Sequence, residues 1–151
     1  MKLRAADAAD APLMASAHAQ AFDRPWDQAT FETLLAGSGV FAFVAEDGDP
    51  AGVVLCRALA GEAEILTLAV PPWARRQGVA RSLMAAALGA ARELGAGACF
   101  LEVDVDNAPA LALYEGLGFE RAGVRKAYYD RGGAGRADAV VMRLDLGTQG
   151  H

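Results

Sequence analysis

The 151-residue sequence lacks any apolar run near the roughly 18 residues that a membrane-spanning helix needs. Its first residues, MKLRAADAAD, have no apolar stretch behind the positive charges, so we expect no secretory signal and a cytoplasmic protein without membrane contact. Only two cysteines are present, and neither Cys56 nor Cys99 has a metal-binding or redox spacing. We therefore expect one domain over residues 1–151 that folds without disulfides or metal.

Familiar nucleotide-binding and nucleophile patterns are also missing. The turn PPWARRQGVARSLM has neither the lysine and serine or threonine pair of a Walker loop nor the G-x-G-x-x-G pattern. Histidine is scarce as well: His18 lies in a helical run, where we expect a surface position, and His151 is the last residue. No serine or cysteine nucleophile with a paired histidine is evident, which argues against a covalent acyl-enzyme.

The chain has fewer basic than acidic residues, 14 against 19, and its net charge is −5. This balance disfavours direct binding to nucleic acid and favours a cationic peptide or amine as partner. With 54% hydrophobic and 22% charged residues, the composition is typical of a compact globular protein rather than a disordered one.

The apolar patterns predict hairpins in the first half of the chain and alternating strands and helices in the second half. Candidate caps are Asp7, Asp27 and Asn107 at helix starts and Gly95 after a helix end, while Trp26 and Phe31 have the spacing of a hydrophobic staple. Strands are expected at 2–5, 40–47, 51–59, 63–70, 97–105, 119–129 and 137–146, and helices at about 7–22, 25–35, 78–95 and 107–119. The fold class is α/β (α+β), a mixed sheet of about seven strands flanked by about four helices.

A candidate anion site follows the strand at 63–70. A helix that begins after Gly78 would present unsatisfied N–H groups and a partial positive charge, and Gly78 would let the backbone approach a phosphate closely. Ala80 keeps the next turn small, and Arg75, Arg76 and Arg81 add positive charge. The alternative is a solvated basic turn in front of an amphipathic helix.

The stretch RRQGVA, placed after a strand and opening a helix, resembles motif A of the GCN5-related N-acetyltransferase (GNAT) family, whose turn holds the pyrophosphate of coenzyme A. The next family element follows in order as LEV, an asparagine, ALY and GLGF, and then RKAYY and ADAVVM. Within the family, these segments look most like the RimI-type enzymes, which acetylate the N-terminal alanine of a small-subunit ribosomal protein. The resemblance extends to QAFDRPWDQATF and so covers nearly the whole chain.

The resemblance implies acetyl-CoA as cosubstrate, no metal, a ribosomal-protein N-terminal peptide as acceptor and a monomer. It implies Glu102 as proton acceptor and Tyr114 as proton donor, with direct attack in a ternary complex. Tyr128 and Tyr129 would line the acceptor site. The implied cofactor contacts are Leu68, Ala69, Val70, Arg75, Arg76, Gln77, Gly78, Val79, Ala80, Arg81 and Asn107.

Several alternatives stay open for these residues. Glu102 could be a solvated strand-end carboxylate, Tyr114 a core aromatic, and Tyr128 and Tyr129 strand aromatics at a sheet edge. FDRPW is one residue longer than the related segment, and Asp130 stands where proline is common, so the acceptor pocket is the part that departs from the pattern.

Other functions remain as alternatives. The same cofactor site would serve an acetyltransferase for a small-molecule amine of polyamine or aminoglycoside type. A non-catalytic acetyl-CoA-binding module is disfavoured because both Glu102 and Tyr114 are present. The segment DVDNAPALALYE has acids at the ends of a calcium-loop spacing, but Ala108 and Pro109 replace the central oxygen ligand and glycine that such a loop requires.

Overall fold

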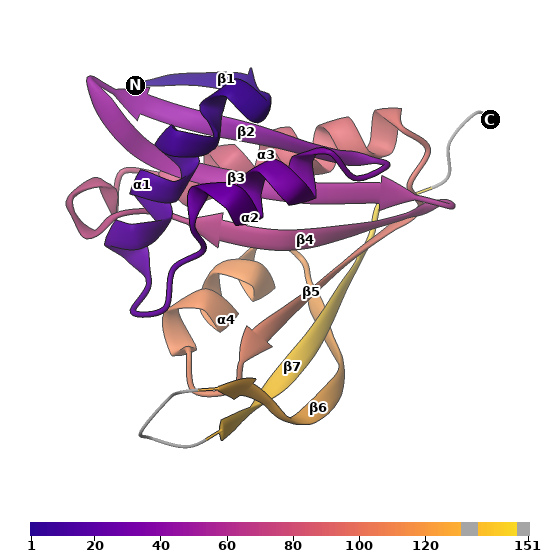
Figure 1. The fold of residues 1–151 in the computed structure, drawn as a ribbon. Helices are drawn as coiled ribbons and strands as arrows, with labels where there is room; N and C mark the ends of the chain where they lie inside the picture. The colour runs from indigo at the N-terminus through magenta and orange to yellow at the C-terminus, as the bar shows by residue number, and fades with distance from the viewer. Residues whose placement is uncertain (131–135, 148–151) are drawn as a thin grey trace.

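The computed structural model describes residues 1–130 and 136–147, and side chains for residues 1–126 and 138–147. The described residues form a seven-stranded sheet and four α-helices (Figure 1), as the sequence predicts. The strands are β1 Lys2–Ala6, β2 Val40–Asp47, β3 Asp49–Leu59, β4 Glu62–Ala69, β5 Ala98–Asp104, β6 Glu120–Asp130 and β7 Arg136–Asp145. The helices are α1 Ala11–Ala21, α2 Gln28–Leu35, α3 Val79–Glu93 and α4 Ala108–Gly116.

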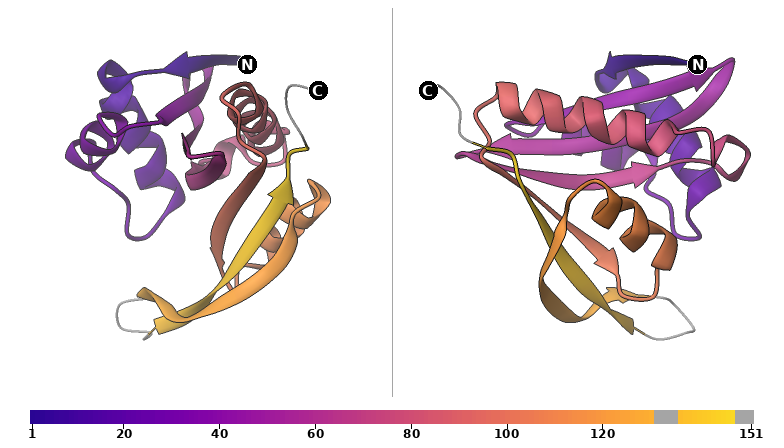
Figure 2. Two further views of the ribbon diagram at one scale, coloured as in Figure 1. Left: turned by 90° about the vertical axis from the view of Figure 1, so that its right-hand side faces the viewer. Right: turned by 180° about the vertical axis from the view of Figure 1, so that it is seen from behind.

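The strand order is β1-β2-β3-β4-β5-β7-β6. Neighbouring strands are antiparallel except for β4 and β5, which run parallel and are connected through α3. Helices α1 and α2 cover one face of the sheet and α3 covers the other, as the side view in Figure 2 shows. Helix α4 lies beside β5, on the same side as α3.

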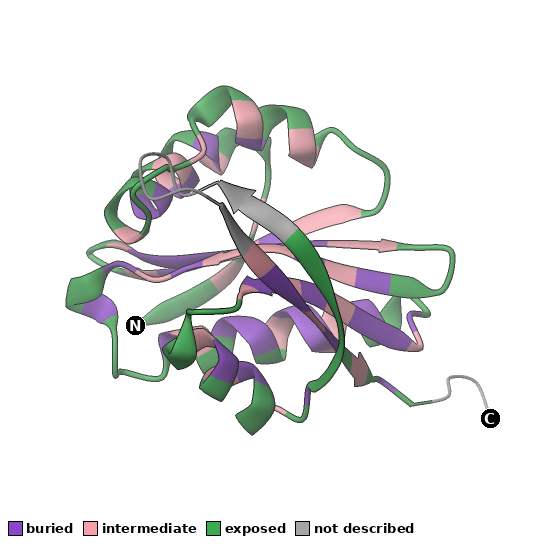
Figure 3. Ribbon diagram, turned by 90° about the horizontal axis from the view of Figure 1, so that it is seen from below, coloured by how far each residue is buried: buried purple, intermediate pink, exposed green. Residues whose placement is uncertain are grey.

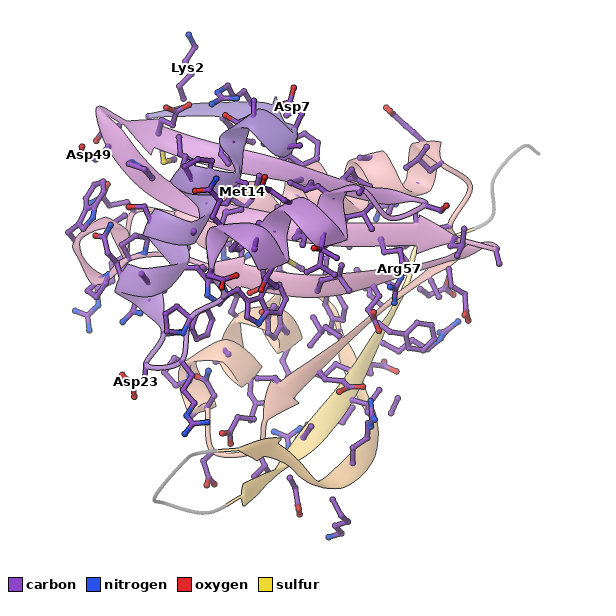
Figure 4. All side chains as sticks on the ribbon, in the orientation of Figure 1. Lys2, Asp7, Met14, Asp23, Asp49 and Arg57 are labelled. Atoms are coloured by element: carbon purple, nitrogen blue, oxygen red, sulfur yellow. The ribbon has the colours of Figure 1, made fainter. Side chains whose placement is uncertain are left out.

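Two apolar cores hold the layers together, one on each face of the sheet. On β3, Val53 and Leu55 pack towards α1 and α2, and Val54 and Cys56 pack towards α3. This alternation follows from the two-residue period of a strand. Met14 of α1, labelled in Figure 4, is fully buried in the first of these cores. Apolar side chains are therefore buried on both faces at the centre of the sheet. A shift by one residue would move them to the wrong face, so this burial fixes the register of the strands that carry the site.

Side-chain caps mark the helix starts that the sequence predicts. Asp27 accepts a hydrogen bond from the Thr30 N–H at 2.9 Å, and Asn107 accepts one from the Ala110 N–H at 3.2 Å. The rings of Trp26 and Phe31 lie 5.6 Å apart, which confirms the predicted staple. Asp7 forms a capping box, but the segment that it caps is a 3₁₀ turn at Ala8–Asp10, and α1 begins after that turn rather than at residue 7.

Among the described residues, none of the helices combines the length and apolar character that a bilayer crossing requires.

Burial is uneven around the molecule. The strand β6 is exposed over residues 120–126, as the view from below shows (Figure 3).

Candidate active site

The strands β4 and β5 pair over only three residues each and then separate. Their parallel ladder joins residues 62–64 to residues 98–100. A register shift opposite Leu55 and Cys56 places a bulge at Leu66, and a bulge bends and twists the strand that carries it. The last residues of β4 therefore turn a backbone edge towards a gap instead of towards β5 (Figure 1). Leu68, Ala69 and Val70, the predicted cofactor-arm strand, lie along or just beyond this edge.

Two hydrogen bonds from side chains to backbone carbonyls form within the turn after β4. The Arg75 Nε donates to the Val70 carbonyl at 3.1 Å, and the Gln77 side-chain amide donates to the Trp73 carbonyl at 3.2 Å. The backbone of Gly78 is left-handed, with φ +76°, and α3 begins directly after it. Because Gly78 has no side chain, it cannot cap the helix, so the first N–H groups of α3 point outward as possible anion donors.

The next turn residues divide between core and surface. Val79 is 2% exposed and faces the core, so any contact with a cofactor would be through its backbone. Ala80 is half-buried and Arg81 is exposed. The Arg81 guanidinium lies 3.0 Å from where a side chain on Gly116 would begin, and this places it at the C-terminal end of α4. Arg81 thus connects the start of α3 with α4, where the partial negative charge of a helix end favours a cation.

Glu102 projects from the face of β5 that is turned away from α3. Cys99, Leu101 and Val103 belong to the core on the α3 side, so strand alternation sends Phe100 and Glu102 to the opposite face. There they line a hollow of about 440 Å³. The remaining lining residues are Arg57, Leu59, Glu62, Ala63, Glu64 and Val141. Figure 4 labels Arg57, which lies at the end of the sheet where β4 and β5 begin.

An arginine that sequence reasoning missed contacts the Glu102 carboxylate. The Arg125 Nη1 donates to Oε1 of Glu102 at 2.6 Å, while Oε2 is buried. The Glu102 side chain is 20% exposed and that of Arg125 is 54% exposed. The Glu102 carboxylate is therefore ion-paired and only partly exposed, which fits a partly solvated strand-end carboxylate as well as a catalytic base.

Tyr114 lies in the helix on the other side of β5. It is 8% exposed, and its ring packs edge to face against Phe119 at a centroid distance of 5.9 Å. Burial raises the pKa of the Tyr114 phenol to about 12. Both its burial and its protonation fit a core aromatic, and the same protonation suits a proton donor. Glu102 and Tyr114 thus lie on opposite faces of β5.

Asn107 and the acids around it have separate roles in the turn after β5. The cap of α4 uses Oδ1 of Asn107, and its Nδ2 is the donor that a cofactor amide or carbonyl would require. Asp104 Oδ1 accepts the Asp106 N–H at 2.9 Å, which is an ordinary local turn contact. The segment is strand, turn and helix, and not the two helices that flank a calcium loop.

His18 departs most clearly from expectation, because it is 3% exposed and not a surface residue. Its Nδ1 accepts the Trp26 N–H at 3.0 Å, and its Nε2 lies 3.0 Å from the Thr67 hydroxyl. Because Nδ1 accepts, the neutral ring carries its proton on Nε2 and donates it to Thr67. Burial lowers the pKa of His18 to about 4. The surface expectation failed because alanines surround His18 in α1, so the sequence pattern does not identify the buried face.

The other groups offer little alternative chemistry. Cys56 and Cys99 are free, buried thiols, and burial raises the pKa of each to about 12, so neither is a ready nucleophile. Within the described ranges, no group of three or more histidine, cysteine or acidic side chains is placed to hold a metal ion. Tyr128 and Tyr129 are in β6, but their side chains lie outside the described residues.

Comparison with protein families decides the relationship. The model of the acetyltransferase (GNAT) family matches residues 9–119. The chain belongs to this family. The matched segment contains the β4 edge, the turn before α3, Glu102 and Tyr114, so the elements of the candidate site lie within the region that defines a GNAT protein.

Related GNAT proteins share most of the chain. The [Ribosomal protein bS18]-alanine N-acetyltransferase of Escherichia coli K12 is 33% identical over 122 residues, which are 81% of this chain and 82% of that protein. The N-alpha-acetyltransferase RimI of Mycobacterium tuberculosis H37Rv is 39% identical over 146 residues, with 92% and 89% of the two chains covered.

A solved GNAT structure confirms the predicted fold. The ribosomal-protein-S18-alanine N-acetyltransferase from Escherichia coli superposes with a TM-score of 0.90 at 30% identity, over 99% of this chain and 96% of that chain. The prediction of an acetyl-CoA-dependent N-acetyltransferase is confirmed at the level of the family. The roles assigned to single residues stay predictions.

Proposed function

We propose that this GNAT protein transfers the acetyl group of acetyl-CoA to the N-terminal amine, an alanine amine, of a small-subunit ribosomal protein. The observation that carries the proposal is the gap between β4 and β5. The start of α3 lies on one face of the sheet. On the other face, a hollow over the paired start of β4 and β5 extends to Glu102, just beyond the end of the β4–β5 ladder. Two substrates could therefore enter from opposite faces and meet at the gap.

The cofactor would lie on the α3 side. Its pyrophosphate would accept hydrogen bonds from the backbone N–H groups of residues 79–81, with Arg75, Arg76 and Arg81 nearby. The pantetheine arm would pair with the open edge of β4, as an added strand does, and Asn107 would donate its Nδ2 to the arm. Leu68, Ala69 and Val70 would supply the backbone groups closest to the acetyl carbonyl.

The reaction then requires two proton movements. The neutral amine nitrogen attacks the thioester carbonyl carbon, and a backbone N–H of the β4 edge stabilises the oxyanion. The nitrogen loses a proton to Glu102, directly or through a water. The C–S bond breaks as the intermediate collapses, and Tyr114 donates its phenolic proton to the departing sulfur. A phenol whose pKa is about 12 remains protonated at neutral pH and is regenerated from solvent.

The acceptor assignment draws on likeness and on charge. Two relatives that cover most of the chain bear the name of a ribosomal-protein alanine acetyltransferase or of RimI. Glu62 and Glu64 line the hollow beside Glu102, and the net charge is −5, so a basic peptide would be attracted to this face. We further propose one domain, a monomer, a cytoplasmic location and an acceptor site completed by Tyr128 and Tyr129.

The acceptor is tested with the purified protein, acetyl-CoA and a panel of amines. A basic peptide that begins with alanine should have the highest kcat/KM, and the same peptide with a blocked N-terminus should be inactive. Spermidine and an aminoglycoside represent the small-amine alternative. A large preference for either small amine would remove the ribosomal-protein acceptor and leave acetyl transfer intact.

The two catalytic assignments are tested by isosteric substitutions. Glu102→Gln and Tyr114→Phe should each lower kcat by roughly 10²–10⁴-fold, the range for lost general acid–base catalysis, because each removes one proton-transfer group. The dissociation constant of acetyl-CoA, measured by calorimetry, should change little. Tyr114→Phe keeps the ring against Phe119, so a loss of turnover would not reflect a lost core contact. Turnover near that of the wild type in both variants would contradict the mechanism.

A further inference from the structure

We propose that Arg125 is a positioning residue for Glu102, which it holds as an oriented carboxylate facing the acceptor. The inference rests on the proposed function, because it assumes that Glu102 accepts the amine proton. It assigns a role to a residue of β6 that contacts the proposed base directly. The evidence is the geometry of one ion pair that spans three strands.

The ion pair reaches across β7, because β5 and β6 are not neighbours in the sheet. Arg125 is level with Ala139 of β7, which in turn is level with Asp104 of β5. Glu102 is level with Val141, and Gly123 occupies the corresponding place on β6. Arg125 therefore extends diagonally, by two residues along the strands, to bring its Nη1 within 2.6 Å of Glu102 Oε1.

The residues along this diagonal leave room for the guanidinium. Ala139 is fully buried and carries only a methyl group, so it cannot block an arginine that crosses β7. Gly123 has no side chain, so β6 offers no competing group at the level of Glu102 itself. Arg125 thus crosses β7 beside a small residue and faces no side chain at Gly123, while Val141 lies next to Glu102 and lines the same hollow.

The partner of Arg125 distinguishes this pair from an ordinary surface ion pair. Exposed ion pairs contribute little because water solvates both charges. Here the carboxylate is mostly buried, with Oε2 out of contact with solvent, and the bond is short and charge-assisted. The guanidinium of an arginine is planar and always charged, so its hydrogen bond both attracts the carboxylate and fixes its orientation.

Charged and titratable groups face Glu102 from each strand around it. They are Arg57 on β3, Glu62 and Glu64 on β4, Asp104 on β5, Arg125 on β6 and Arg143 on β7. Arg57 contacts Glu64 at 2.8 Å, and Arg143 lies over the ring of Phe100 at 5.9 Å. Arg125 donates to the Glu102 carboxylate. The carboxylates on β4 and β5 repel the negative charge of Glu102 and so oppose the effect of Arg125.

The test compares Arg125→Ala and Arg125→Lys with Arg121→Ala. Arg121 is a matched control because it lies on the same strand, is 55% exposed and pairs with Glu115 at 3.6 Å. In Arg125→Ala, kcat/KM for the peptide should fall about tenfold to a hundredfold, as for a lost hydrogen bond to a charged group. The loss should lie in kcat, and the dissociation constant of acetyl-CoA should stay within about twofold.

The conservative variant separates charge from orientation. Arg125→Lys should recover part of the kcat lost in Arg125→Ala, because the positive charge remains, but it should stay severalfold below the wild type, because the guanidinium geometry is lost. This variant also carries the test if Arg125→Ala is poorly folded, as judged by its melting temperature. A wild-type kcat in every folded Arg125 variant would overturn the proposal.

Introducing Arg125→Ala into a Glu102→Gln protein distinguishes failure of this inference from failure of the proposed function. In a Glu102→Gln protein, Arg125→Ala should cause no further loss of kcat/KM, because the carboxylate that it positions is gone. An equal further loss in both backgrounds would show that Arg125 acts elsewhere. If Arg125→Ala behaves like Arg121→Ala while Glu102→Gln is impaired, the inference fails and the function stands. Full activity of Glu102→Gln alone would contradict the role of Glu102 as base, on which this inference rests, and leave acetyl transfer to the peptide intact.

Discussion

Burial sets the protonation state of the side chains around the gap. The Tyr114 phenol has a pKa of about 12, so it is protonated at neutral pH and holds the proton that the sulfur of coenzyme A would take up as the C–S bond breaks. The same effect keeps Cys56 and Cys99 as inert thiols. A site with a protonated donor and no reactive thiol suits direct attack better than a covalent intermediate.

His18 supports the site from the first helix, and its burial makes stability depend on pH. The pKa of His18 is about 4 in the folded protein and about 6.5 when exposed, so the unfolded chain binds more protons between these values. Its neutral form stabilises the fold fully above pH 6.5, and that contribution is lost as the pH falls towards 4. His18→Gln removes this titration, so the melting-temperature difference between wild type and variant should shrink from pH 7 to pH 4.5.

The comparison is made by calorimetry or circular dichroism at several pH values. Other groups titrate in both proteins and cancel in the difference. A difference that stays constant over this range would show that His18 does not titrate as its burial indicates. A second measurement, kcat at pH 7.5, reports whether the His18–Thr67 contact also holds β4 in its active arrangement.

The residues that could be predicted from the sequence and those that could not differ in how far away their contact partners lie along the chain. Asp27 and Asn107 were predictable because a cap bonds to the backbone three residues away. His18 and Arg125 were not, because their partners Thr67 and Glu102 are 49 and 23 residues distant in the chain. The alternation of β5 could have suggested that Glu102 avoids the core, but it could not identify the cation from β6.

At the scale of elements, the start of α3 depends on two glycines with different functions. Gly78 supplies a left-handed backbone, and a side chain built there would meet nothing within 4 Å. Gly52 of β3 supplies close approach, because a side chain there would lie 2.9 Å from atoms of both Val79 and Leu83. One glycine shapes the turn towards solvent, and the other lets the helix pack onto the sheet.

Gly78→Ala should weaken acetyl-CoA binding more than it weakens the fold. The left-handed backbone costs an alanine roughly 1–2 kcal/mol, and the new methyl group occupies the open side of the turn. Gly61→Ala is a matched control, because Gly61 has φ +83°, is equally open and lies at the other end of β4. Melting temperatures of the two variants should fall similarly, but the KM for acetyl-CoA should rise about tenfold only in Gly78→Ala. Equal KM values would place the pyrophosphate elsewhere.

Gly52→Ala should destabilise the protein by about 1–3 kcal/mol, the usual cost of overpacking a buried contact. The melting temperature should fall by roughly 3–10 °C for a domain of this size. Gly89→Ala is the matched control within α3, since a side chain there meets nothing within 4 Å. It should stabilise the protein by roughly 0.5–1 kcal/mol, because alanine favours the helix over glycine. An unchanged melting temperature for Gly52→Ala would show that α3 can move away from β3 at little cost.

The elements themselves were largely predictable, whereas the gap between β4 and β5 was not. Apolar periodicity and caps are local signals, and they located the four helices and seven strands. The bulge at Leu66 and the end of the β4–β5 ladder arise from how three strands pair and twist together. Leu68 and Ala69 could be assigned to a strand from sequence, but not to an open strand edge.

At the scale of the whole molecule, the two faces that meet at the gap differ in charge. The turn before α3 carries Arg75 and Arg76 on an exposed surface. The hollow on the opposite face carries Glu62, Glu64 and Glu102, of which Glu64 is paired with Arg57 and Glu102 with Arg125. An anionic cofactor and a cationic acceptor would therefore be drawn to different faces of the same gap. This separation would also keep the two substrates from competing for one entrance.

The charge of the molecule leads to a salt-dependence prediction. At saturating acetyl-CoA, kcat/KM for a basic peptide that begins with alanine should fall severalfold between about 50 mM and about 500 mM salt, because ions screen the attraction to a protein of net charge −5. A peptide with the same first residue and neutral residues in place of the basic ones should show little change.

The two peptides separate long-range attraction from the chemistry, since both present the same amine to Glu102. Screening acts on encounter, so the loss should appear in kcat/KM and not in kcat. Glu62→Gln and Glu64→Gln together should flatten the response of the basic peptide and leave the neutral peptide unchanged. If the basic peptide is insensitive to salt, or if its loss lies in kcat, the acidic hollow does not attract the acceptor, and recognition depends on short-range contacts at the first residue.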